Sequence, residues 1–237
     1  MSVKYSNGYE SKNLGKQSKR LIFKNLSTQY LVNTFELKRV KNSPILKDWL
    51  EMPYNISTGT HIELATLRDK LDFNWQDYNE GELKWKYLYP LFNLADHEKD
   101  EQYNTFIGRT IKATIKGKKL KGKVDYILSS SEFEPVTPFF LLQEYHKKEE
   151  GTTDDIIGRL LSAMLVAQKL NKDNRPIYGS YVISGRLWFF VVLEGKEYSI
   201  SSGHIGSNDD IFEVYGILYN VRKIIKERLI EQQESDE

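Results

Sequence analysis

The chain has 237 residues, of which 40% are hydrophobic and 28% charged, with a formal net charge of +1 and no cysteine. This charge balance excludes a basic coat over the whole molecule. The lack of cysteine excludes disulfides, thiol catalysis and Cys-based zinc sites, and is typical of a cytoplasmic protein. The length is large for one domain and small for two, so we expect one core domain with an N-terminal extension.

Several function classes lack their sequence signals. No apolar run approaches the roughly 20 residues of a membrane-spanning helix, and the polar N-terminus lacks the apolar stretch of a signal peptide. We therefore expect no membrane partner. A Gly-rich P-loop, an HExxH motif and a Gly-x-Ser-x-Gly motif are also absent from the sequence, which disfavours NTPases, zincins and α/β-hydrolases.

The first 75 residues predict a polar tail and a helical extension. The tail is followed by a short strand near residue 22. Apolar residues then recur at helical spacing after Ser, Thr or Pro start signals in residues 27–37, 44–52 and 58–71. We expect these helices to bury Leu, Trp and Phe against the core, with partner recognition as the alternative role.

Residues 76–237 predict the core domain, which begins with a helix at residues 79–95. The helix has a regular apolar side, but Pro90 lies inside the pattern. Proline removes a backbone donor and its ring collides with the preceding turn. We therefore expect a kink or an early end near Tyr89.

A lysine-rich hairpin follows. Residues 103–116 and 122–129 predict two strands joined by a turn at 117–119. Its basic side chains are Lys112, Lys116, Lys118, Lys119, Lys121 and Lys123. On a regular strand, Lys121 and Lys123 share a face with Asp125. The cluster either guards a sheet edge or contacts phosphate groups.

Two carboxylates occur on consecutive predicted strands. Asp125 lies among apolar residues on the second strand, and Glu144 ends the next apolar run, residues 139–142. An N-cap cluster at 152–154 then starts a helix that crosses over the sheet, with Arg159 in its first turn.

The rest of the chain predicts strands and a closing helix. Residues 176–184 and 186–193 are strongly apolar and rich in β-formers, and a short strand follows them. The Gly/Ser loop after it carries His204, which we expect to be solvated. A long amphipathic helix from residue 209 to about residue 233 should pack over the sheet, and its outer side offers a surface for a homodimer.

The succession of a helix with Glu80, a strand with Asp125 and a strand ending at Glu144 resembles the core of the PD-(D/E)XK, or restriction-endonuclease-like, superfamily. Members carry an Asp on one strand and Glu-x-Lys on the next. The resemblance covers about residues 76–193 and the closing helix. It implies an α/β fold with a central mixed β-sheet flanked by helices.

The resemblance also implies a nuclease that uses Mg²⁺ or Mn²⁺. The metal ligands would be Asp125, Glu144, the carbonyl of Tyr145, and Glu80, with Glu82 as the second choice for the last. The alternative for both helix residues is that they are water-exposed partners of the helix dipole.

The catalytic cation is ambiguous in the sequence. His146 occupies the position of the family lysine and shares the face of Glu144 on a regular strand, whereas Lys147 follows one residue later. A bulge at Tyr145 or His146 would bring Lys147 to that face.

Nucleic acid, with DNA favoured, is the partner that the resemblance implies. The expected contacts are Lys118, Lys119, Lys121, Lys123 and Arg159. One alternative is a member that has kept the fold and lost the chemistry, acting as a nucleic-acid-binding or protein-interaction module. Another is a structural protein whose carboxylates simply pair with Lys147 or Arg159.

Overall fold

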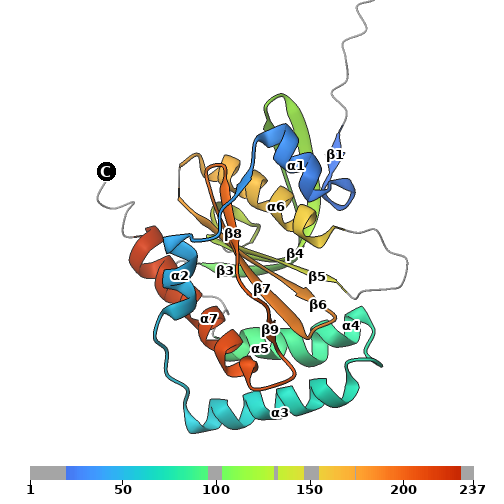
Figure 1. The fold of residues 1–237 in the computed structure, drawn as a ribbon, viewed down its shortest axis with the longest axis vertical. Helices are drawn as coiled ribbons and strands as arrows, with labels where there is room; N and C mark the ends of the chain where they lie inside the picture. The colour runs from blue at the N-terminus through green and yellow to red at the C-terminus, as the bar shows by residue number, and fades with distance from the viewer. Residues whose placement is uncertain (1–19, 96–102, 131–132, 147–154, 174, 231–237) are drawn as a thin grey trace, which may run out of the picture.

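The computed structural model describes residues 20–95, 103–130, 133–146, 155–173 and 175–230. These residues form a nine-stranded mixed sheet with helices on both faces (Figure 1), which confirms the predicted α/β fold. The strands are β1 (Leu21–Ile22), β2 (Lys38–Arg39), β3 (Asn104–Ile115), β4 (Lys118–Ser130), β5 (Val136–His146), β6 (Ile177–Ile183), β7 (Leu187–Glu194), β8 (Glu197–Ile200) and β9 (His204–Ile205).

Seven α-helices occur in the described part of the chain. They are α1 (Thr28–Phe35), α2 (Pro44–Glu51), α3 (Thr58–Asn74), α4 (Glu80–Leu83), α5 (Tyr89–Leu94), α6 (Ile156–Asn171) and α7 (Asp210–Ile224). A 3₁₀ turn, η1 (Phe23–Asn25), and two π-helical segments, η2 (Lys84–Leu88) and η3 (Ile225–Ile230), complete the set. Serines cap α1, α2 and α3, as the start signals predict.

The sheet order is β1-β4-β5-β6-β7-β8-β2, with β3 also paired to β4 and β9 to β7. Strands β3, β4 and β5 are antiparallel neighbours, whereas β5 and β6 are parallel and are connected through α6. The β3–β4 turn consists of Lys116 and Gly117, both at positive φ, and therefore lies one residue earlier than expected.

Two hydrophobic cores fill the spaces above and below the sheet. Helices α1 and α6 cover one face, and α2, α3, α5 and α7 cover the other (Figure 1). The division at residue 75 stays a prediction, but the extension is closely joined to the rest. Its strands β1 and β2 pair with β4 and β8, and its Trp49 is completely buried in the core beneath α7.

The helix with Pro90 does not end near Tyr89. The chain stays helical to Leu94 because η2 widens the turn, so that the Tyr89 N–H donates to the carbonyl of Lys84, five residues back. The wider turn accommodates the proline ring, which would collide with a regular α-helical turn. This π-helical segment also fixes the position of Lys84.

The start of α6 is tied to the start of α1. Asp155, rather than a residue of 152–154, is the N-cap of α6, and residues 152–154 lie outside the described part of the chain. Its carboxylate accepts hydrogen bonds from the Gly158 N–H and from the N–H and hydroxyl of Thr28. A Cβ at Gly158 would lie 2.2 Å from the carbonyl oxygen of Leu26. The two helices therefore meet backbone to backbone.

Gly158→Ala is expected to lower the free energy of unfolding by about 1–3 kcal/mol, because the added methyl group meets backbone that cannot move aside. Gly59→Ala in α3 is the matched control, since the nearest atom to its added Cβ lies 3.8 Å away. The control should be neutral or slightly stabilising. Urea unfolding followed by circular dichroism measures both. Equal effects would contradict the close approach of α6 and α1.

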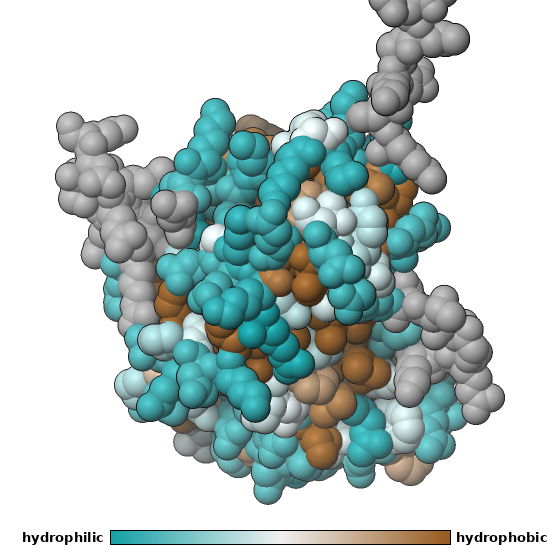
Figure 2. All heavy atoms as spheres, turned by 45° about the horizontal axis from the view of Figure 1, so that its top comes forward, coloured by the Kyte–Doolittle hydropathy of each residue, from teal (hydrophilic) through white to brown (hydrophobic). Residues whose placement is uncertain are grey.

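None of the helices in the described ranges combines the length and apolarity that crossing a membrane requires. In Figure 2, hydrophilic residues cover much of the visible face and hydrophobic ones form smaller areas. The homodimer through the closing helix stays a prediction. The apolar side of α7, including Val214, Leu218 and Val221, is buried against the sheet.

Candidate functional site

Asp125 and Glu144 come together where β4 and β5 separate. The last regular pair on this side is Tyr126 with Gln143, so the next step along both strands places Asp125 opposite Glu144. The Tyr145 N–H donates to Asp125 Oδ2 over 3.1 Å. The Asp125 carboxylate thus accepts a hydrogen bond at a point where the strand ladder has ended.

The alternation of side chains between the two faces of β4 breaks at Asp125. Gly108 on β3 has a φ of 64°, and the Gly108–Asp125 pair is missing from an otherwise constant register. Val124 belongs to the core beneath α6, whereas Tyr126 belongs to the opposite core. The regular alternation that would place Lys121 on the face of Asp125 therefore does not apply.

Two cations close over the carboxylates from opposite layers. Lys84 comes from η2, and its Nζ lies 3.0 Å from Asp125 Oδ1 and 2.5 Å from Glu80 Oε1. Arg159 comes from α6, and its Nη2 lies 2.5 Å from Glu144 Oε2 and 3.5 Å from Asp125 Oδ2. The arrangement agrees with the alternative in which Arg159 pairs with the carboxylates.

Burial and charge perturb this cluster. Glu144 is completely buried, and its Oε1 has no hydrogen-bond partner. Burial raises the pKa of Glu144 well above its ordinary value, with Asp125 adding to the rise and Arg159 opposing it. Burial acts to lower the pKa of the Lys84 ammonium, but Glu80 and Asp125 together raise it above its ordinary value.

The cluster remains within reach of solvent. The side chains of Asp125, Lys84 and Arg159 keep 15%, 17% and 18% of their surface exposed. These three side chains are therefore partly accessible, whereas Glu144 is completely buried.

The two acidic residues at the start of the first core helix have different roles. Glu80 pairs with Lys84, which stands between it and Asp125. Glu82 forms a capping box with Asn79 and an ion pair with Lys86, so it fulfils the expected alternative of a helix-terminus partner.

Strand β5 keeps a regular register with β6 through His146, so the pairing shows no bulge at Tyr145 or His146. His146 is half-buried at the end of the strand. Lys147 lies outside the described residues. The position at which the PD-(D/E)XK resemblance predicts a lysine is thus occupied by His146, on a strand that continues regularly.

Lys84 is the residue that the sequence interpretation missed. It follows Glu80 by four residues, a spacing that places both side chains on one side of a helix. That spacing was a usable signal. In the sequence, Pro90 is the one feature that indicates the widened turn of η2, which brings Lys84 to Asp125.

The predicted lysine contacts Lys118, Lys119, Lys121 and Lys123 are all exposed, on the part of β4 that precedes Asp125. The expectation of a solvated His204 is wrong. Its side chain is only 14% exposed, because β9 places it against β7, and its Nδ1 lies 3.3 Å from Glu213 Oε2.

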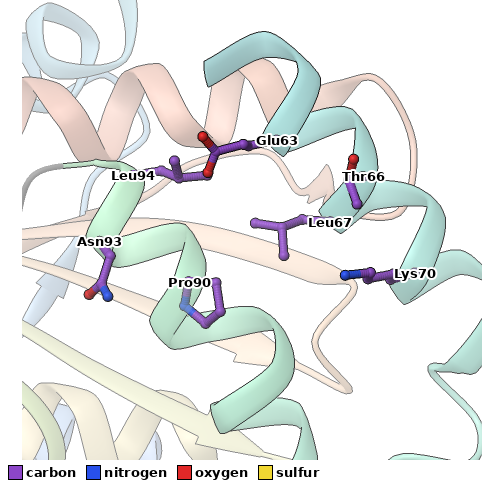
Figure 3. Close-up of a pocket in the computed structure, with 7 residues that line it drawn as sticks. All are labelled: Glu63, Thr66, Leu67, Lys70, Pro90, Asn93 and Leu94. Carbon is purple, nitrogen blue, oxygen red and sulfur yellow. The ribbon is translucent and has the colours of Figure 1, made fainter. Parts of the chain in front are cut away.

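A separate hollow of about 500 Å³ lies between α3 and α5 (Figure 3). Its charged lining residues are Glu63 and Lys70. Asp125 and Glu144 do not line it, and we place no chemistry there.

The carboxylate pair does not by itself form a complete metal cage. Among the described residues, no group of three His, Cys, Asp or Glu side chains is arranged to hold a metal ion. The donor set of the site is instead two carboxylates flanked by two cations.

Comparison with known proteins assigns no family. No family model matches the chain. No curated protein matches it either. A solved structure described as the crystal structure of SSO0001 has 12% sequence identity and a TM-score of 0.23, over 80% of this chain and 88% of that one.

Proposed function

We propose that the chain is a metal-dependent nuclease with a restriction-endonuclease-like core. The observation that supports the proposal best is the meeting of Asp125 and Glu144 at the separation of β4 and β5, with Lys84 beside them. The element order supports it too: a helix, an antiparallel hairpin, a third strand, and a crossover helix to a parallel strand.

The donor chemistry fits a hard divalent cation. Mg²⁺ and Mn²⁺ prefer carboxylate oxygens, and the buried Oε1 of Glu144 has no other partner. Asp125 would supply the second carboxylate, and the Tyr145 carbonyl stays a proposed third ligand. When bound, such an ion lowers the pKa of a water ligand and polarises a phosphate.

The protein's own residues would position and neutralise the phosphodiester. Lys84 replaces the missing lysine of the strand, because its ammonium already lies beside Asp125 and can contact a phosphate oxygen. Arg159 favours the ionised form of the buried Glu144. Glu80 forms an ion pair with Lys84 and is separated from Asp125 by that lysine. In this proposal Glu80 is therefore a positioning residue rather than a metal ligand.

Cleavage of labelled DNA and RNA with Mn²⁺ or Mg²⁺ tests the proposal. Asp125→Asn is expected to lower the cleavage rate by about 10²- to 10³-fold, the loss of several kcal/mol of transition-state stabilisation. Asp72→Asn, an exposed residue of α3, is the matched control and should cleave like the wild type. Equal rates in both variants would locate any cleavage elsewhere or in a contaminant.

One observation favours the second candidate, a non-catalytic nucleic-acid-binding or protein-interaction module. Lys84 and Arg159 already neutralise the carboxylates, as they would in a purely structural ion-pair network. A wild-type protein that binds DNA, yet neither binds Mn²⁺ nor cleaves, would favour this function.

A further inference from the structure

A basic hollow of about 440 Å³ lies on the β1–β4–β3 part of the sheet, away from the carboxylate pair. Its lining includes the four cations Arg20, Lys112, Lys119 and Lys121. None of its lining residues is acidic. In the described ranges of the chain, none of these four cations takes part in an ion pair. Their positive charges are therefore available to bind an anionic ligand.

The strand register places these cations on one face. Lys112 lies directly opposite Lys121, and Arg20, one step before the Leu21–Leu120 pair, lies beside Lys119. Leu120, Gly122 and Val124 alternate with the lysines and are buried. Exposed Lys123 is the next lysine of this face, two residues before Asp125.

Protection of a sheet edge does not explain this arrangement. Strand β4 is paired with β3 on one side and with β1 on the other at Leu120 and Lys121, so Lys121 stands on an interior strand, although its neighbour Lys112 lies on the edge strand β3. Like charges directly opposite each other destabilise an antiparallel pair. A bound polyanion would remove that cost.

We propose that this hollow, with Lys123, is the surface that holds the phosphate backbone of the nucleic acid substrate. The inference rests on the proposed function and deepens it. A strand rises about 3.3 Å per residue, so Asp125 lies about 13 Å along β4 from Lys121. A backbone held by the lysines therefore lies within about 13 Å of Asp125. Lysine contacts of this kind are independent of sequence.

This surface differs from the nucleic-acid contacts predicted from the sequence. Lys112 and Arg20 join Lys119, Lys121 and Lys123, whereas Arg159 is engaged by the carboxylates. Lys116, another lysine of the hairpin, is engaged by Glu36.

Fluorescence anisotropy of a short labelled DNA duplex, measured in EDTA between about 50 and 200 mM salt, tests the surface without any need for metal or cleavage. Lys119→Gln with Lys121→Gln is expected to weaken binding about tenfold or more at the lower salt concentration. The slope of log affinity against log salt should shrink by about 1.8, which is about 0.9 for each phosphate that the variant no longer neutralises.

Lys41→Gln with Lys70→Gln removes the same charge from exposed sites away from the hollow and serves as the control. Equally weakened binding in the two double variants would overturn the proposal. Binding to phosphatidylserine vesicles is measured in parallel. The proposal would also be overturned if Lys119→Gln with Lys121→Gln weakened vesicle binding and left DNA binding unchanged. Binding through the hollow by a wild type that never cleaves would support this surface and refute the nuclease.

Discussion

Lys84→Met is expected to lower the rate of metal-dependent cleavage by about 10²- to 10³-fold, the usual effect of removing one preorganised charge-stabilising group. The Lys84 ammonium lies 3.0 Å from Asp125 and is held by Glu80, so it is fixed before substrate arrives. Methionine is an unbranched side chain one atom shorter than lysine, and it removes the charge. Single-turnover cleavage of a labelled duplex measures the change in the chemical step.

Lys86→Met is the control for this variant. Lys86 also pairs with a glutamate four residues before it, but that pair is exposed and includes neither Asp125 nor Glu144. The control should cleave at the wild-type rate, and Lys84→Arg should retain part of the activity. Full activity in Lys84→Met would show that another cation, with His146 the first candidate, acts in its place.

Trp49→Ala is expected to lower the free energy of unfolding by about 3–5 kcal/mol, as for other large core side chains. The Trp49 indole is completely buried, donates to the Ile217 carbonyl over 2.9 Å, and meets Tyr178 and Phe190 edge to face. It therefore joins α2 to both α7 and the sheet. Urea unfolding followed by far-UV circular dichroism gives the difference.

Trp85→Ala is the matched control, because the Trp85 side chain is 75% exposed. Its effect should stay within about 0.5 kcal/mol. A destabilisation below about 1 kcal/mol in Trp49→Ala would mean that the extension is not anchored to the sheet as described.

Most elements of the fold were predictable from local signals. Serine caps and helical spacing located α1 to α3, and apolar runs with turn residues located β3 to β7. The pairing of β1 with β4 and of β2 with β8 was not predictable, because each of the short strands β1 and β2 has only two residues and its partner lies far along the chain.

The candidate site was predictable only in part, because local signals identify its carboxylates but not the contacts around them. Asp125 and Glu144 stood out because carboxylates are rare within apolar strands. The approach of Lys84 depends on the widened turn before Pro90, and the geometry of Asp125 depends on the irregularity at Gly108. Those features arise from tertiary packing, which periodicity in the sequence does not report.

The most direct test of the proposed metal site is a calorimetric titration with Mn²⁺, in the presence and absence of a non-hydrolysable duplex. The wild type is compared with the double variant Asp125→Asn, Glu144→Gln. We expect the wild type to bind Mn²⁺ and the double variant not to bind it. No wild-type binding at millimolar Mn²⁺, even with the duplex present, would contradict the proposed metal site.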